Sequence, residues 1–245
     1  MDIAQKIKKL KKKIDSLRPL TPSELRELHK WYAVTYTYHS NALEGNTLSL
    51  GETKLVVEDG ITVGGHPLRE ILEAKNHKEV IEELISIIQK KKSITEQLIK
   101  KLHKTLIKEI DNETAGRYRK IQVYITGEEV LPPPARRVPL LMKEFWAWFA
   151  KQKKTDPVVL AAKAHYRFVK IHPFTDGNGR IARVLSNIIL MRAGYPLVII
   201  PVVVRQKYLT ALHSSRTEMD FVTFFQEITL ENMKDYLRMI GHSAK

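Results

Sequence analysis

One run of thirteen residues, 171–183, gathers side chains that could do chemistry. It reads Ile-His-Pro-Phe-Thr-Asp-Gly-Asn-Gly-Arg-Ile-Ala-Arg, and apolar residues continue after it at helical spacing. Gly177, Asn178 and Gly179 allow a tight turn that presents backbone N–H groups. An anion is stabilised at such a place because the dipole of the following helix adds to those donors. The run therefore predicts a loop that enters a helix and binds an anion.

The charged and titratable side chains of the run indicate which anion. Arg180 and Arg183 lie three positions apart, so both would leave one face of the first helical turn and could fork onto phosphate oxygens. Asp176 is a hard oxygen ligand where a phosphate-bound Mg²⁺ would lie. His172 could take a proton from an attacking hydroxyl near neutral pH. Together they predict a nucleoside triphosphate site with a general base.

Two other interpretations of the run are weaker. A P-loop is excluded because the pattern G-x-x-x-x-G-K-[ST] is absent. A glycine-rich helix start, with His172 and Asp176 as mere capping residues, would explain any one residue but not the whole set.

The run resembles the signature of the Fic (filamentation induced by cAMP) family, His-Pro-Phe-x-[Asp/Glu]-Gly-Asn-Gly-Arg-x-x-Arg, and matches every specified position. Members of that family move AMP from ATP onto a protein hydroxyl. The resemblance implies that His172 is the base, that Asp176 binds Mg²⁺ and that Asn178 belongs to the α-phosphate anion hole. Arg180 and Arg183 would hold the β- and γ-phosphates.

Two more positions refine the resemblance. Phe174 would be a buried anchor of the loop. The related death-on-curing phosphotransferases have lysine where this chain has Gly179, so the sequence favours AMP transfer. A transferase that uses another nucleotide or phosphoryl donor remains an alternative.

A second informative stretch is Ser-Asn-Ala-Leu-Glu-Gly-Asn, residues 40–46. Ser40 and Glu44 are four apart and would share a helix face. The stretch resembles the family's inhibitory motif, [Ser/Thr]-x-x-x-Glu-[Gly/Asn], whose glutamate pairs with the second signature arginine, here Arg183. A carboxylate there would occupy the guanidinium that the γ-phosphate needs and would repel that phosphate. In some members the same glutamate positions a water that removes AMP, so a de-AMPylase is the second alternative.

The stretch before three consecutive prolines alternates like a β-strand. We expect a β-hairpin with its first strand at Ile121, Gln122, Val123, Tyr124 and Ile125, and a return at 130–131. It resembles the Fic flap, an exposed edge that binds the target segment by β-augmentation. The flap would bring the acceptor hydroxyl close to His172.

Apolar residues at spacings of three and four over most of the chain predict a mainly helical bundle, with the hairpin at its active site. An amphipathic helix within 1–20 should dock on its own domain. Residues 21–245 should form a single Fic domain, with an inhibitory helix at about 22–45 and the core at about 94–230. Two closing helices are expected, one around Phe221 and one around Met233. The resemblance also implies that Tyr208 contacts the base side of the nucleotide.

Composition limits the class of protein. The chain has 245 residues and no cysteine, so a reducing compartment fits. It contains no apolar run long enough for a membrane span and no signal-peptide core. We therefore expect a cytoplasmic enzyme without a membrane partner. Three histidines, His66, His77 and His103, have no partner at metal-ligand spacing and are expected on helix faces or the surface.

The partners follow from the predicted chemistry. ATP with Mg²⁺ would be the donor, and the acceptor would be a Ser, Thr or Tyr hydroxyl of a target protein or of the chain itself. The net charge of +14 comes largely from short lysine clusters, which we interpret as solvated helix faces. A nucleic-acid partner is disfavoured because no zinc-finger or RNP motif accompanies them. A basic, non-catalytic binding module is a further alternative, and a homodimer stays open.

Overall fold

The computed structural model describes residues 2–17, 19–124, 131–214 and 217–242, and the regular elements within them are all helical. In chain order they are α1 (Ile3–Asp15), α2 (Pro22–Ala42), α3 (Leu50–Lys54), η1 (Leu55–Asp59), α4 (Leu68–Gln89), α5 (Glu96–Ile107), η2 (Ala135–Arg137), α6 (Val138–Ala150), α7 (Pro157–Ile171), α8 (Asn178–Arg192), η3 (Val202–Val204), α9 (Arg205–Leu209), η4 (Thr210–Ser214) and α10 (Glu218–His242). Every helix among them is too short or too polar to span a bilayer.

Local capping chemistry fixes several helix starts. The Thr21 hydroxyl accepts from the Glu24 N–H at 3.3 Å, and the Glu24 carboxylate accepts from the Thr21 N–H at 2.7 Å. Ser49 and Glu52 form the same reciprocal box before α3. Such a box satisfies two backbone donors that a helix leaves open at its start. These helices therefore begin where the sequence predicts.

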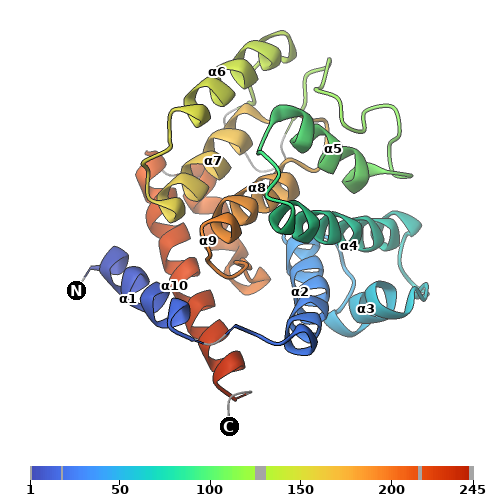
Figure 1. Ribbon diagram of the computed structural model, residues 1–245. Coiled ribbons are helices and arrows are strands. Elements are labelled where there is room, and N and C mark those ends of the chain that lie inside the picture. Colours follow the sequence, from blue (N-terminus) through green and yellow to red (C-terminus); the bar gives the residue numbers. More distant parts are fainter. Residues whose placement is uncertain (1, 18, 125–130, 215–216, 243–245) are drawn as a thin grey trace.

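Helix α8 lies at the centre of the molecule, and α2, α4, α5 and α7 pack around it (Figure 1). Twelve of its fifteen residues are buried, which is the pattern of a helix that is covered on all sides. Because the signature run enters this helix, its first turn is held by the whole core.

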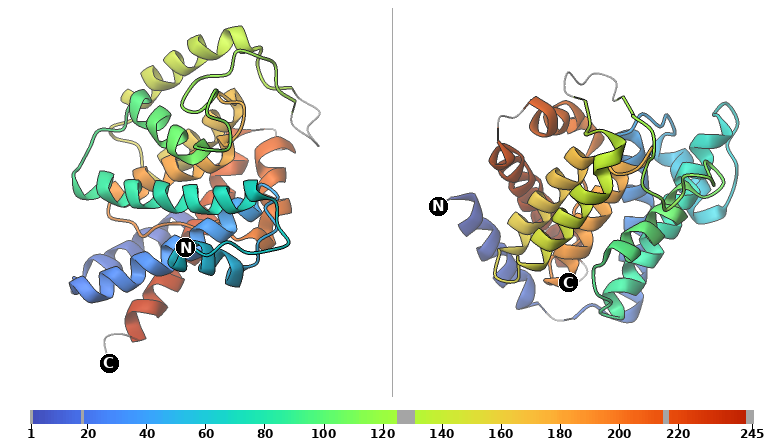
Figure 2. Two further views of the ribbon diagram at one scale, coloured as in Figure 1. Left: turned by 90° about the vertical axis from the view of Figure 1, so that its right-hand side faces the viewer. Right: turned by 90° about the horizontal axis from the view of Figure 1, so that it is seen from above.

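The last helix corrects one prediction. Where two closing helices are expected, a single helix, α10, runs from Glu218 to His242. No glycine or proline interrupts residues 218–240, so nothing in the backbone ends the helix between the two apolar groups. Helix α1 lies along α10 (Figures 1 and 2) and packs Ile3, Ile7, Leu10 and Ile14 toward the core.

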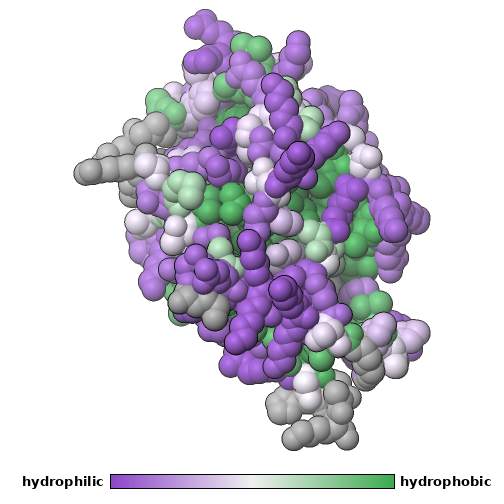
Figure 3. Space-filling model, turned by 60° about the vertical axis from the view of Figure 1, so that its left-hand side comes forward, coloured by the Kyte–Doolittle hydropathy of each residue, from purple (hydrophilic) through white to green (hydrophobic). Residues whose placement is uncertain are grey.

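The polar side of α1 faces solvent. Its lysines at positions 6, 8, 9, 12 and 13 are exposed. Hydrophilic residues cover most of the face that Figure 3 draws, with hydrophobic ones visible between them.

The predicted hairpin stays a prediction. Residues 121–124 make no strand pairing, and Ile125, with 126–130, lies outside the described residues. Side chains bind the backbone here in place of a ladder: Gln122 donates to the carbonyl of Pro132 at 3.1 Å. The Arg119 guanidinium donates to the carbonyls of Ile121, at 3.1 Å, and Pro133.

Candidate active site

The signature loop begins where α7 ends. His172 takes a left-handed backbone conformation, φ 50° and ψ 62°, and its N–H donates to the Phe168 carbonyl at 3.0 Å. A residue other than glycine seldom adopts this conformation. Arg119 stabilises this conformation. Its side-chain Nε donates to the His172 carbonyl at 2.7 Å, and its backbone N–H donates to the Pro173 carbonyl at 2.9 Å. The backbone of the predicted base is therefore held on both sides.

The middle of the loop is closed by Asn178 and anchored by Phe174. The Asn178 Oδ1 accepts from the Phe174 N–H and its Nδ2 donates to the Phe174 carbonyl, both at 2.9 Å. Phe174 is fully buried and its ring stacks on His103, with centroids 3.7 Å apart. The amide side chain of Asn178 is thus used inside the loop.

His77 of α4 and His103 of α5 lie on helix faces, as expected, but these faces are buried and neither residue is at the surface. The His103 Nδ1 accepts from the Gly116 N–H at 2.8 Å, so Nε2 carries the proton and donates to the Asp176 carbonyl at 3.0 Å. Burial lowers the pKa of His103 to about 4. The neutral His103 ring therefore stabilises the signature loop through its hydrogen bond to Asp176 and its contact with Phe174.

Asp176 and Arg180 form a closed set of alternating charges with Arg69 and Glu73 of α4. Asp176 accepts from the Gly177 N–H at 2.5 Å and from Arg180 at 3.3 Å, and it also pairs with Arg69. Arg180, which is 1% exposed, has its Nη1 3.3 Å from the Glu73 carboxylate. Burial, the largest single effect, raises the pKa of Asp176, but the charges of Arg180 and Arg69 and the Gly177 N–H together outweigh it, and the net pKa is lowered. Asp176 is therefore a carboxylate at neutral pH.

Arg183 is buried, and all three nitrogens of its guanidinium donate hydrogen bonds. Its Nε donates to the Ser40 hydroxyl at 3.0 Å, and its Nη2 donates to the Ser40 carbonyl at 2.7 Å. Nη2 also donates to the Glu44 carboxylate at 2.7 Å, and Nη1 to the Tyr208 hydroxyl at 3.2 Å. Burial, the largest single effect, lowers the pKa of Arg183, but the charge and hydrogen bond of Glu44 together with Tyr208 and Tyr36 outweigh it, and the net pKa is raised. The guanidinium stays charged.

The Glu44 carboxylate lies directly over the first turn of α8. Helix α2 ends at Ala42, so Glu44 reaches Arg183 from the turn that follows. A methyl group added to Gly179 would come within 2.3 Å of Glu44 Oε1 and 3.2 Å of Arg183 Nη1. The side chain of Glu44 is 38% exposed. The helix start that the sequence assigns to an anion is thus covered by the chain's own carboxylate.

The first backbone N–H groups of a helix have no acceptor within that helix. Asn178, Gly179 and Arg180 hold these positions in α8, and Gly177 before them has a left-handed φ of 74°. A phosphate placed there would meet these donors, the helix dipole and Arg183. This arrangement suits the triphosphate of a nucleotide.

Tyr208 lies on the guanidinium side of this site. It is 3% exposed, and its hydroxyl contacts Arg183 and, at 3.0 Å, His165 Nε2. The predicted contact with the base of a nucleotide stays a prediction.

The described structure brings ten predicted side chains and glycines to one region around the start of α8. They are Ser40, Glu44, His172, Asp176, Gly177, Asn178, Gly179, Arg180, Arg183 and Tyr208. Arg119 links Ile121, the first residue of the predicted strand, to His172 of this region. Arg69, Glu73 and Arg119 were missed because no local spacing links them to the signature. The pair Arg69 and Glu73, four apart on one helix, was the one available signal.

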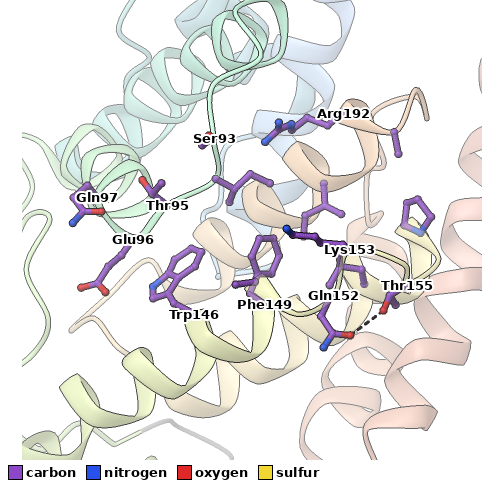
Figure 4. A pocket seen from close by; sticks show the side chains of 16 residues that line it. Ser93, Thr95, Glu96, Gln97, Trp146, Phe149, Gln152, Lys153, Thr155 and Arg192 are labelled. Carbon is purple, nitrogen blue, oxygen red and sulfur yellow. Dashed lines mark hydrogen bonds between the residues drawn. The ribbon is translucent and has the colours of Figure 1, made fainter.

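A cavity of about 840 Å³ lies away from this site, between the start of α5 and the ends of α6 and α8 (Figure 4). Its wall includes Trp146, Phe149, Lys153 and Arg192, and none of the signature residues lines it. The site is therefore identified by its chemistry and not by cavity size.

Comparisons with known proteins identify chains that are similar in sequence and in fold. Residues 93–190 match the model of the Fic/DOC family. The chain is 35% identical over 239 residues to Protein adenylyltransferase Fic of Drosophila melanogaster and of Drosophila persimilis. The match covers 95% of this chain but 48% and 47% of those proteins, so the chain spans about half the length of these curated relatives.

Two solved structures share the fold over nearly the whole chain. One is a Fic domain containing signaling protein from Bacteroides thetaiotaomicron, 32% identical, with a TM-score of 0.85 and 96% of each chain covered. The other is Fic-1 from C. elegans, 32% identical, with a TM-score of 0.88, 98% of this chain and 72% of that chain covered.

Proposed function

The chain belongs to the Fic/DOC family, and from that membership we propose that it is a protein adenylyltransferase restrained by its own Glu44. It would move AMP from ATP to a Ser, Thr or Tyr hydroxyl of a target protein. The observation that carries the proposal is the 2.7 Å pair between Glu44 and Arg183, which lies over the anion-binding start of α8.

The transfer step assigns one task to each residue. His172 accepts the proton of the target hydroxyl, and the hydroxyl oxygen attacks the α-phosphorus of ATP. The bond from that phosphorus to the bridging oxygen breaks, and pyrophosphate leaves. The backbone N–H groups at 178 and 179 stabilise the α-phosphate, while Arg180 and Arg183 stabilise the departing charge.

The Asp176 carboxylate would be a ligand for a Mg²⁺ ion that enters the site together with the nucleotide. This carboxylate is 42% exposed, and no group of three or more acidic, histidine or cysteine residues in the described part of the chain could hold a metal alone. Mg²⁺ commonly uses one or two protein carboxylates together with substrate phosphates and water. Bound to Asp176, it would neutralise phosphate charge.

Inhibition follows from competition for one guanidinium edge. While Glu44 accepts from Arg183 Nη2, the γ-phosphate lacks that donor and meets a like charge. ATP then binds weakly or with its α-phosphorus out of line for attack.

We assign residues 22–45 as the inhibitory element of a single domain, 21–245, preceded by the helix within 1–20. The absence of cysteine supports a cytoplasmic location.

The decisive experiment is transfer of label from α-labelled ATP to protein, with mass spectrometry of the products. Glu44→Gly should raise transfer by about tenfold or more, because a charge-assisted hydrogen bond of about 1.5–3 kcal/mol is lost from the inhibited state. Adding His172→Ala should abolish it. The control is Glu27→Gly, which also places a glycine in the inhibitory element. In the described structure Glu27 pairs only with Lys30, so this variant should leave transfer low. Unchanged labelling in the His172→Ala protein would refute the mechanism.

A second candidate, AMP removal from a modified target, is favoured by the exposure of Glu44. A carboxylate that is 38% exposed and lies beside the α-phosphate position can accept a proton from an attacking water. With an AMP-modified protein as substrate, Glu44→Gly should then abolish AMP release.

A further inference from the structure

A line of buried polar groups continues from Arg183 into the protein interior. Arg183 Nη1 lies 3.2 Å from the Tyr208 hydroxyl, which lies 3.0 Å from His165 Nε2. On the other side of the ring, His165 Nδ1 lies 3.3 Å from the Ser186 hydroxyl. Arg183, Tyr208, His165 and Ser186 are at most 3% exposed. Chains of hydrogen bonds in such a setting fix the geometry of their members.

The donors and acceptors of this line can be assigned. The Ser186 hydroxyl donates to the carbonyl of Ala161, at 3.1 Å, or Ala182, at 3.0 Å. Its oxygen is then left to accept from His165 Nδ1, so Nε2 carries no proton and accepts from the Tyr208 hydroxyl. The Tyr208 oxygen accepts in turn from Arg183, which can only donate. This assignment gives the polar hydrogens of Ser186, His165 and Tyr208 one acceptor each.

His165 is suited to this task because it stays neutral. Burial lowers the pKa of its ring well below the ordinary value, and the charge of Arg183 lowers it further. The ring also packs against Phe221, with centroids 4.9 Å apart. His165 thus presents a fixed acceptor to Tyr208.

Ser40 and Tyr208 hold three N–H groups of Arg183, one on each nitrogen, and Glu44 takes the second on Nη2. We propose that His165, acting through Tyr208, is a positioning residue that fixes Arg183 so that its Nη2 edge can exchange Glu44 for the γ-phosphate of ATP. The inference rests on the proposed function. It assigns His165 to the part of the site that separates a triphosphate from a diphosphate.

The test measures binding of ATP and of ADP in the presence of Mg²⁺ by isothermal titration calorimetry, with every variant in the Glu44→Gly protein. ADP lacks the γ-phosphate, so the ratio of the two dissociation constants reports on that group alone. Tyr208→Phe and His165→Phe should each reduce the preference for ATP about tenfold, with ADP affinity unchanged. His165→Gln, which can place an amide oxygen near the position of Nε2, should keep most of the preference.

Tyr36→Phe is the matched control. It also removes a fully buried tyrosine hydroxyl near Arg183, but one that makes no hydrogen bond to that guanidinium in the described structure. Its preference for ATP should stay unchanged.

An unchanged preference for ATP in Tyr208→Phe would overturn the inference, and so would an equal loss of ATP and ADP affinity in His165→Phe and His165→Gln. Both results leave the proposed function intact as long as the Glu44→Gly protein transfers AMP. If that protein neither binds ATP nor transfers AMP, the proposed function fails and takes the inference with it.

Discussion

At the scale of single residues, the site depends on which group occupies the start of α8. A guanidinium with fixed neighbours offers a limited set of donor directions. Ser40 and Tyr208 take those that face the interior, and Glu44 takes the one that faces the anion position. Under the proposed function, an incoming γ-phosphate displaces Glu44 from this position.

Gly179→Ala tests this contact by stability. The added methyl would lie 2.3 Å from Glu44 Oε1, so Glu44 must swing away from Arg183. We expect unfolding free energy to fall by about 1–3 kcal/mol, the value of a lost hydrogen bond to a charged group. In the Glu44→Gly protein the same change should be neutral or stabilising by up to about 1 kcal/mol, because alanine favours a helix over glycine. Urea denaturation measures both, and equal effects in the two backgrounds would contradict the arrangement.

His103 predicts a pH dependence of stability. Its pKa is lowered to about 4 in the folded protein from an ordinary 6.5. Between pH 6.5 and about 4 the unfolded chain therefore binds a proton at His103 that the native protein does not bind. The contribution of the neutral His103 ring to stability is complete above pH 6.5 and is lost as the pH falls toward 4. The loss should reach about 3 kcal/mol. His103→Gln, which cannot titrate but retains a donor and an acceptor, should show a shallower fall than the wild type by that amount.

At the scale of elements, Arg119 joins two segments that α6 and α7 separate in the sequence. Arg119 is 3% exposed, and its guanidinium donates to the carbonyl of His172 in the signature loop, to that of Ile121 in the predicted flap and to that of Pro133. A planar fork can satisfy three acceptors at once, which a lysine ammonium on a flexible stem cannot match in geometry. The residue thus ties the position of the base to the segment expected to bind the target.

Arg119→Lys should lower AMP transfer to a protein target by about tenfold to a hundredfold, since small displacements of a catalytic group are costly. The dissociation constant for ATP should change little because Arg183 and the start of α8 are untouched. The matched control is Arg117→Lys, at an exposed neighbour, which should leave transfer unaltered. A parallel loss of ATP binding in Arg119→Lys would mean that the residue only stabilises the fold.

At the scale of the whole molecule, one core supports every part of the site. The largest buried cluster runs from Ile7 of α1 through α8 to Met233 of α10. The charges of the site lie near the starts of α4 and α8 and just after the end of α2. The site should therefore be lost together with the core and not before it.

Ile7→Ala tests this cooperativity. Ile7 is 3% exposed, and removing such a side chain commonly costs about 2–4 kcal/mol. Unfolding followed by far-ultraviolet and near-ultraviolet circular dichroism should shift to lower urea by the same amount in both signals. Lys9→Ala, at an exposed position of the same helix, should change stability by about 0.5 kcal/mol or less. Separate transitions in the two signals would show that α1 is an independent unit.

The signature could be interpreted from the sequence because its members are neighbours in the chain. A glycine-rich turn, a helix start and the residues from His172 to Arg183 follow one another within thirteen positions, so local backbone preferences bring them together. The mainly helical fold followed from periodicity in the same way. The prediction from periodicity was wrong at α10. One long helix and two consecutive helices in the same register give the same apolar spacing, so periodicity alone does not show whether there is a break between them.

Tertiary structure decided how the charges are paired. Glu44 lies 139 positions from Arg183, and Arg69 lies 107 positions from Asp176. The resemblance to a family motif suggested the first of these pairs, and nothing in the sequence suggested the second. His165 and Tyr208 meet 43 positions apart through α7 and α9. Such contacts depend on how buried helices pack, and packing is set by the shape of the whole core, which local sequence patterns do not carry.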